Sequence, residues 1–193
     1  MKEINLDIFE GDTFAESFLP YARGKMGEAC AVVLERKPHA CPVEIGVSGY
    51  FEDRLQISWQ KLPHHGGYDD DQVRTEYAGL AMAVLVMFTC AKLVVIGAMK
   101  KGKGVDLKFK PLEPQTAPPN LDFMDDDALI YYCEAKGSDH KKYIQKQLDK
   151  GLNNCNKKHK DRPEAHEAYV ISSEFETPAV LTAKYEHHGT THA

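Results

Sequence analysis

The chain has 193 residues, which is enough for one domain with a well-developed hydrophobic core. Its composition, 42% hydrophobic and 27% charged, is that of a globular protein and excludes a low-complexity chain. The net charge of −5 conceals a basic segment, because residues 92–162 carry 15 Lys and Arg against 10 Asp and Glu. Such a segment is either a contact surface for a polyanion or a solvated lysine-rich surface, and charge alone leaves both open.

The cysteines and the apolar runs indicate the compartment. The five cysteines show no CxxC spacing, and several lie inside apolar runs, where a free thiol packs as a small hydrophobe. This pattern favours a reducing compartment over a disulfide framework. The first residues, MKEINLDIFEGDTF, are too acidic and polar for a signal peptide, and the longest apolar run, residues 78–91, is short for a membrane span. We therefore expect a cytoplasmic protein with no membrane partner.

The first 72 residues predict short elements. The stretch from Thr13 to Ala31 contains a short helical pattern that ends near the segment GKMGEA, residues 24–29. Three segments rich in Val and Ile, separated by Pro, Gly and charged turns, predict strands over residues 29–36, 42–49 and 54–61. Residues 62–72 have the composition of a loop, and its last Asp residues offer a helix N-cap.

The clearest single element is a helix over residues 72–88, which we expect to be central and buried. Its apolar residues recur at helical spacing and include Val73, Tyr77, Leu80, Ala81, Val84 and Phe88. Residues 92–98 predict a buried strand, residues 99–104 a basic glycine turn, and residues 105–109 a second strand with alternating apolar and charged residues.

The remaining third of the chain predicts strands on both sides of a lysine-rich helix. A loop rich in Pro and Asp over residues 110–127 precedes a strand over residues 128–136. The helix follows over residues 139–158, with an apolar side formed by Tyr143, Ile144, Leu148, Leu152 and Cys155. Strands over residues 168–175 and 179–186 come next, before a tail that we expect to fray. The expected class is α/β, a mixed sheet flanked by helices.

Three charged residues at the strand ends suggest chemistry. Asp106 follows the glycine turn, and Glu134 and Lys136, two residues apart on a strand, share one face. If the two strands are neighbours, the carboxylates can hold a divalent cation through hard oxygen ligands. Such a cation polarises a phosphate and lowers the pKa of an attacking water, and the lysine can orient that water or offset developing charge. Phosphodiester hydrolysis needs this combination.

The segments GKGVDLKF and ALIYYCEAKG resemble the PD-(D/E)xK superfamily, the restriction-endonuclease-like fold, through Asp106 and Glu134-x-Lys136. The resemblance covers residues 70–186 and implies a core of a helix, three strands, a helix and a further strand. Residues 1–65 would be a β-rich N-terminal elaboration of the same single domain, 1–193. Val105 stands where the pattern has Pro, at a position that varies in the family. The resemblance implies a nuclease, or nuclease subunit, that uses Mg²⁺ or Mn²⁺ and acts on nucleic acid, with DNA expected before RNA.

The resemblance also implies further site residues. Some members complete the metal site with an acid on the first core helix, and Glu76 is the matching residue here. A few members use a Gln or Tyr on the helix after the lysine, for which the candidates are Tyr143, Gln145 and Gln147. Phosphate contacts, with salt-sensitive binding and little sequence choice, are expected from Lys100, Lys101, Lys103, Lys141 and Lys142. A homodimer or a partner protein is also compatible with this reading.

The competing reading is a catalytically inactive nuclease-like protein that serves as an interaction or assembly module. The acidic chain, its short length and the lack of a separate DNA-reading motif favour it, and a fold does not fix a function. Asp106 and Lys108 would then face solvent on an edge strand, and Glu134 and Lys136 would form a surface ion pair of little energy.

Other features also have ordinary interpretations. Glu76 would be an acid favoured by the helix dipole in the first turn. The paired histidines at 64–65 and 187–188 lack partners at zinc-ligand spacing and are expected in loops. The strands before residue 65 could extend the sheet, form a dimer interface or bind a partner.

Overall fold

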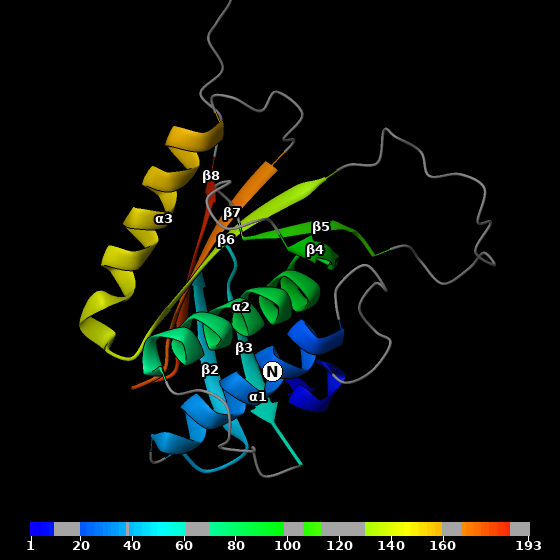
Figure 1. Cartoon of the computed structure of the whole chain (residues 1–193), viewed down its shortest axis with the longest axis vertical. Helices are drawn as coiled ribbons and strands as arrows, with labels where there is room; N and C mark the ends of the chain where they lie inside the picture. The colour runs from blue at the N-terminus through cyan, green and yellow to red at the C-terminus, as the bar shows by residue number, and fades with distance from the viewer. Residues whose placement is uncertain are drawn as a thin grey trace, which may run out of the picture.

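The protein is a mixed α/β fold, in which one curled sheet of eight strands carries three α-helices (Figure 1). The computed structural model describes residues 1–9, 20–37, 39–60, 70–98, 106–112, 130–159 and 167–185. In this part of the chain the strands are β1 (Lys2–Asn5), β2 (Val43–Gly49), β3 (Asp53–Ser58), β4 (Leu93–Ala98), β5 (Leu107–Pro111), β6 (Tyr131–Ser138), β7 (Glu167–Glu174) and β8 (Ala179–Tyr185). The helices are α1 (Pro20–Arg36), α2 (Asp71–Cys90) and α3 (Ile144–His159), with short 3₁₀ turns η1 (Leu6–Phe9) and η2 (Lys141–Tyr143).

The strands follow the order β1-β3-β2-β8-β7-β6-β5-β4 across the sheet. Three pairs are parallel, β1 with β3, β2 with β8, and β6 with β7, and the other pairs are antiparallel. The N-terminal strands join the rest of the sheet through β2 and β8, where Val47 lies opposite Val180. Of the three roles left open for these strands by the sequence, extension of the sheet is therefore the one observed.

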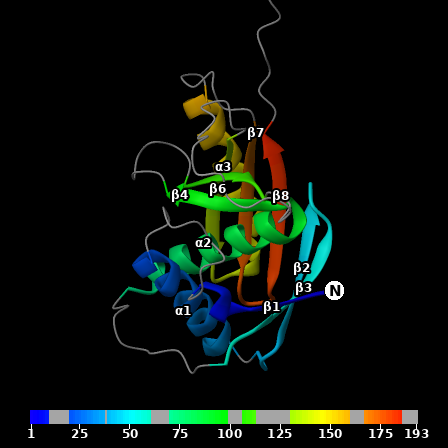
Figure 2. The same cartoon turned by 90° about the vertical axis from the view of Figure 1, so that its right-hand side faces the viewer.

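The helices form one layer on each face of the sheet (Figures 1 and 2). α1 and α2 pack on each other and on the face that carries the main core, to which β6 contributes Cys133 and Ala135. α3 covers the opposite face, where Leu148 and Cys155 pack against Val170 of β7. Because side chains alternate along a strand, Glu134 and Lys136 belong to the face covered by α3.

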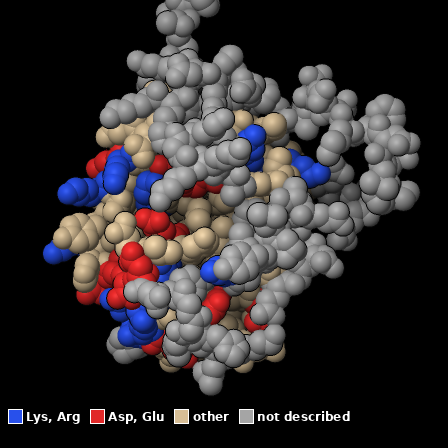
Figure 3. All heavy atoms as spheres, viewed as in Figure 1, with Lys and Arg blue, Asp and Glu red and all other residues tan. Residues whose placement is uncertain are grey.

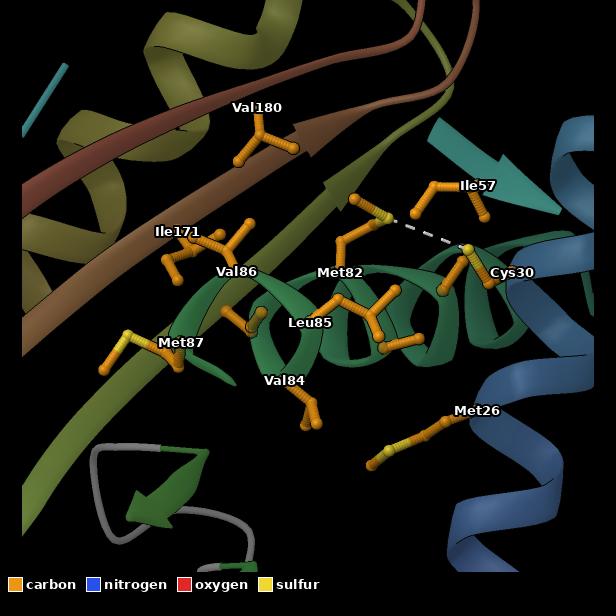
Figure 4. Close-up of a cluster of buried hydrophobic side chains, with 14 of the residues drawn as sticks. Met26, Cys30, Ile57, Met82, Val84, Leu85, Val86, Met87, Ile171 and Val180 are labelled. Atoms are coloured by element: carbon orange, nitrogen blue, oxygen red, sulfur yellow. Dashed lines mark hydrogen bonds between the residues drawn. The ribbon is translucent and has the colours of Figure 1, made fainter. Parts of the chain in front are cut away.

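α2 is the central helix that the sequence predicts. Asp70 caps its first turn by accepting a 2.7 Å hydrogen bond from the Gln72 backbone N–H. All residues from Ala81 to Met87 are fully buried, so this segment of α2 is packed on every side. A helix that is apolar all around is expected to be buried in this way. Its Met82 Sδ lies 3.8 Å from Cys30 Sγ of α1 (Figure 4), and burial raises the pKa of the Cys30 thiol to about 12.

Most predicted elements are confirmed, with ends shifted by a few residues, but the strand predicted over residues 29–36 is wrong. These residues continue α1, which reaches Arg36. Every residue from Ala29 to Leu34 is buried against α2 and the sheet, so no polar position reveals the helical period. A short apolar run of this kind has the same appearance as a buried strand. β1, by contrast, was not predicted from the sequence.

Two details of the predicted pattern also differ. Val73 and Tyr143, which the sequence places on apolar helix sides, are 39% and 38% exposed. β5 lies between β4 and β6, so Asp106 and Lys108 do not belong to an edge strand. All five cysteines are free thiols, in agreement with the absence of a disulfide framework. The glycine turn at 99–104 and both histidine pairs fall outside the described residues.

α2 crosses β6 in direct backbone contact, and two glycines permit this. A Cβ atom on Gly137 would lie 2.1 Å from the Thr75 carbonyl oxygen, and a Cβ atom on Gly79 would lie 2.7 Å from the Gly137 nitrogen. The sequence suggests that Gly137 ends the strand, but β6 continues to Ser138. Gly137 is therefore a packing residue inside the strand, and it brings the first turns of α2 next to Lys136.

We predict that Gly137→Ala destabilises the fold, whereas Gly46→Ala does not. The first substitution forces backbone groups apart, and overpacking of this kind costs about 1–3 kcal/mol or more. Gly46 lies in β2 with no atom within 4 Å of its Cβ position, so alanine there is expected to be neutral or stabilising by up to about 1 kcal/mol. Urea unfolding midpoints measure both, and equal midpoints for the two variants would contradict the close approach.

Candidate functional site

The candidate site lies where β5 separates from β6. Leu107, the first residue of β5, pairs with Cys133, whereas β6 continues to Ser138 and, among the described residues, pairs there with β7 alone. Asp106 completes the ladder at this point, because its backbone N–H donates to the Cys133 carbonyl (3.0 Å) and its Oδ2 accepts from the Ala135 N–H (2.9 Å). The Asp106 carboxylate is thus fixed beside the end of β6. The sequence alone did not show that β5 and β6 are neighbours, and the structure places them side by side.

Glu134 and Lys136 form an ion pair that is buried rather than superficial. Lys136 Nζ lies 2.7 Å from Glu134 Oε1 and 3.7 Å from Asp106 Oδ2. The exposed fractions are 3% for the Glu134 side chain, 21% for Lys136 and 38% for Asp106. The surface ion pair considered from the sequence is therefore not what the structure contains, and the three predicted residues meet at one point.

Asn154 of α3 is a fourth member of this group. Its side-chain N–H donates a 2.9 Å hydrogen bond to Glu134 Oε1, the same oxygen that meets Lys136. Gly151, one turn earlier on α3, packs against the Glu134 side chain and Val170, and this lets the helix approach the strand. Sequence analysis missed Asn154, although it lies seven residues after Gln147 and hence on nearly the same helix face.

The charges around Lys136 favour its protonated form. Burial by itself lowers the pKa of an ammonium group, but the carboxylates of Asp106 and Glu134 outweigh this effect and raise the pKa of Lys136 above 10.5. The same region raises the pKa of the Cys133 thiol, mainly through burial and secondly through the charge of Asp106. Lys136 is thus a fixed positive charge, and Cys133 is a neutral packing residue.

α2 forms the other wall of the site. Gly137 and Gly79 bring the first turns of this helix against β6, and Thr75 Oγ1 donates a 3.0 Å hydrogen bond to Asp139. Glu76, one residue further, is exposed and accepts a 3.2 Å hydrogen bond from Gln72. The structure thus brings the predicted Glu76 to the same region as the strand residues.

A cleft of about 720 Å³ opens between the two helices at this edge of β6. Its lining comes from α2, from the end of β6 and from the start of α3, and it includes Glu76, Asp106, Lys136, Tyr143, Gln147 and Lys150. Two of the three candidates on the helix after the lysine, Tyr143 and Gln147, therefore line the cleft. Gln145 does not, because it points along α3 and donates to Asp149.

The predicted phosphate-binding lysines are only partly described. Lys141 and Lys142 are exposed near the cleft, in η2, but do not line it. Lys100, Lys101 and Lys103 fall outside the described residues. Lys150, which lines the cleft, was not among the predicted residues, although it belongs to the lysine-rich helix.

The described residues contain no group of three or more His, Cys, Asp or Glu side chains arranged to hold a metal ion. The two carboxylates of Asp106 and Glu134 are bridged by Lys136, and Glu76 is not grouped with them as a third ligand. Any metal at this site would therefore depend on two carboxylates together with water or substrate oxygens.

Comparison with known proteins gives no relative for this chain. No protein-family model matches it, and neither a search of curated proteins nor a search of solved structures finds a match.

The whole of α2 is long and apolar enough to cross a membrane, whereas the shorter apolar run at residues 78–91 is not. Because 67% of its apolar window is buried in the protein, and core helices meet the same criteria, this is weak evidence for a membrane span.

We predict that Lys136→Met lowers the free energy of unfolding by roughly 1.5–3 kcal/mol at pH 7, because it leaves a buried carboxylate without its charged partner. The raised pKa of Lys136 means that its contribution is fully present below pH 10.5 and is lost as the pH rises through the higher folded-state pKa. The stability difference between wild type and variant should therefore stay constant from neutral pH to about pH 10 and shrink above it.

Urea unfolding at a series of pH values tests this, with Lys150→Met, which removes an exposed lysine, as the control. A difference that grows above pH 10.5, or that Lys150→Met reproduces, would contradict the assigned role of the buried pair.

Proposed function

We propose that this protein is a metal-dependent phosphodiesterase, a nuclease or nuclease subunit that acts on nucleic acid through Asp106, Glu134 and Lys136. The observation that carries the proposal is the meeting of these three side chains beside a cleft, at the point where β5 leaves β6. Two carboxylates and an ammonium at an open strand edge are the groups that phosphodiester hydrolysis requires.

The order of elements supports the proposal. α2, β4, β5, β6, α3 and β7 follow one another as the helix, three strands, helix and strand of the PD-(D/E)xK superfamily that the sequence resembles. The first three of these strands are antiparallel neighbours and the fourth runs parallel to the third. We therefore propose a restriction-endonuclease-like core for residues 70–186, with the earlier residues as an extension of its sheet.

The donor groups fit Mg²⁺ or Mn²⁺. Lys136 Nζ contacts both carboxylates, so the Glu134 and Asp106 oxygens already surround one positive charge. Mg²⁺ is commonly held by one or two carboxylates plus waters and substrate phosphate, and this matches a site with no third fixed ligand. Asp106 and Glu134 would hold the ion in competition with the ammonium, and Glu76, which lines the same cleft, stays the candidate for an additional ligand that the family resemblance suggests. When bound, the ion would polarise the phosphate and acidify the attacking water.

The protein side chains supply position and charge. Lys136, protonated at any physiological pH, faces the cleft edge and would offset the negative charge that develops on the phosphate oxygens. The bond from Asn154 fixes one oxygen of Glu134 and so sets the orientation of this carboxylate. Asp106 is fixed in turn by the Ala135 N–H. We place the substrate phosphate at the mouth of the cleft, with DNA as the first substrate to test.

An interaction module without catalysis is the second candidate. The observation that favours it is the absence of a three-ligand group among the described side chains, together with a lysine that already neutralises the two carboxylates. In that case the charged group would only stabilise the fold, and a partner protein or a second copy of the chain would be the ligand. Metal dependence separates the two candidates.

We predict that the purified protein cleaves DNA or RNA when Mg²⁺ or Mn²⁺ is present and not in EDTA. Asp106→Asn, Glu134→Gln and Lys136→Met should each lower the cleavage rate by at least about a hundredfold, because each removes a metal ligand or the fixed charge. Cleavage of labelled single-stranded and duplex substrates, followed on denaturing gels, measures the rates.

Gln145→Ala is the matched control, since Gln145 lies on α3 outside the cleft. Its cleavage rate should equal that of the wild type. Failure of the folded wild-type protein to cleave any substrate with either metal would reject the nuclease and favour the interaction module.

We further predict that Asn154→Ala weakens the metal site without removing it. Loss of a residue that orients a metal ligand typically costs 10–100-fold in metal affinity or activity, so the half-saturating Mn²⁺ concentration should rise by about that factor. Asn153→Ala, which changes the exposed neighbouring residue, should leave this concentration unchanged. A lower rate at an unchanged half-saturating Mn²⁺ concentration would instead indicate a purely structural role for Asn154.

A further inference from the structure

The cleft continues into a second hollow along α3. This hollow has a volume of about 820 Å³ and shares Tyr143, Gln147 and Lys150 with the cleft. It extends past Lys146 to Asn153 and Asn154, the residue that holds Glu134. We call this hollow the α3 groove, and it is lined by Tyr143, Lys146, Gln147, Asp149, Lys150, Asn153 and Asn154. The groove adjoins the cleft through their three shared residues.

The spacing of the polar residues in the α3 groove places them on one side of the helix. Tyr143, Lys146, Lys150 and Asn153 follow one another at intervals of three or four residues, which bring side chains to neighbouring positions on a helix surface. Lys146 and Lys150 are exposed, and within the described part of the chain neither forms an ion pair. The groove contains one acid, Asp149, which accepts a hydrogen bond from Gln145.

The two walls of the site differ in charge. The α3 side contributes Lys150 to the cleft lining, whereas α2 contributes the acid Glu76 and no lysine. Figure 3 shows basic side chains on the left of the molecule, over α3, next to acidic side chains over the start of α2. A single strand that follows α3 can contact Lys146 and Lys150, whereas the second strand of a duplex would face Glu76 without a lysine from α2 in the cleft lining.

Tyr143 lies at the junction of the groove and the cleft, and its ring is accessible. The residue is 38% exposed, although it is aromatic. The Lys142 ammonium lies 4.9 Å from the ring centroid, and the His140 ring centroid lies 6.0 Å away, edge-on. An exposed aromatic ring beside a row of lysines is the arrangement with which proteins stack the bases of single strands and bind their phosphates.

We propose that the α3 groove binds a single strand of nucleic acid, with its phosphates along Lys146 and Lys150 and one base stacked on Tyr143. The strand would then enter the cleft at Lys136. What happens to the strand there rests on the proposed function, but binding in the groove does not require catalysis.

Binding without metal tests the proposal separately from cleavage. Fluorescence anisotropy in EDTA would measure the affinity of the full chain for a labelled single-stranded DNA, an RNA of the same sequence and a hairpin duplex. Tighter binding to single strands than to the duplex, by about tenfold or more, is the expected result, on the scale of one stacked base. Equal or tighter binding to the duplex, or no binding to either single strand, would overturn the proposal. The DNA and RNA samples show which strand type is preferred.

Single substitutions test the named contacts. Tyr143→Ala should weaken single-strand binding by about five- to a hundredfold, and Tyr143→Phe should retain most of it, because stacking needs the ring and not the hydroxyl. Lys150→Gln should reduce the slope of log affinity against log salt concentration by about 0.7, the value for one phosphate contact with a single strand. Lys92→Gln is the control, because it removes the same charge from an exposed lysine outside the α3 groove. Lys92 follows the C-terminal end of α2. An unchanged salt slope for Lys150→Gln would overturn the proposed phosphate contact at Lys150. A reduction of the slope by the same amount in Lys92→Gln would also overturn it.

The outcomes for binding and for cleavage are distinguishable. Single-strand binding that depends on Tyr143 and Lys150, without cleavage in any metal, would support the groove and reject the nuclease. Cleavage of duplexes, with no effect of Tyr143→Ala or Lys150→Gln on binding, would support the nuclease and reject the groove. Melting temperatures of the exposed-residue variants, equal to that of the wild type, show that binding losses do not come from unfolding.

Discussion

The architecture of the candidate site depends on the backbone contact between α2 and β6. Only glycine fits at Gly137, where a Cβ atom would overlap the Thr75 carbonyl, and at Gly79, which faces Gly137 across the contact. The close contact between α2 and β6 packs the buried part of α2 against the sheet. It also places the polar first turns of α2 beside Lys136. The wall of the cleft and the centre of the core are therefore consequences of one packing arrangement, and neither can shift without the other.

The second constraint is the early start of β5. Since β5 begins opposite Cys133, the end of β6 has a neighbouring strand on one side only within the described part of the chain. The Ala135 N–H donates instead to the Asp106 carboxylate. The hydrogen bond that closes the ladder also fixes a carboxylate beside Glu134 and Lys136. A buried Glu134 is tolerable because an ammonium and the Asn154 amide both meet its Oε1. Stability and the proposed chemistry therefore use the same contacts, and α3 connects them with the basic groove on its surface.

A large part of the candidate site could be predicted from the sequence because it depends on short-range patterns. Glu134 and Lys136 are two residues apart on a strand, so their shared face follows from the pleat alone. Glu76, which lines the cleft, was expected through the family resemblance, which implies an acid on the first core helix. Asn154 could not be selected in this way, because its place near the face of Gln147 does not reveal its bond to Glu134, which forms only when α3 docks on β6. The role of Gly137 as a packing residue was likewise invisible before the crossing of α2 was known.

The sequence by itself determined the order of helices and strands after Asp70, the apolar nature of α2 and the charge pattern at the strand ends, because propensity, periodicity and capping act over a few residues. The tertiary structure decided that Ala29–Leu34 is helical, that the N-terminal strands join β8, and that the ion pair of Glu134 is buried. It also decided which side chains of α3 face the cleft. These outcomes depend on contacts between residues that are far apart in the chain. The free energy of burying such residues against one another cannot be predicted from a local sequence pattern.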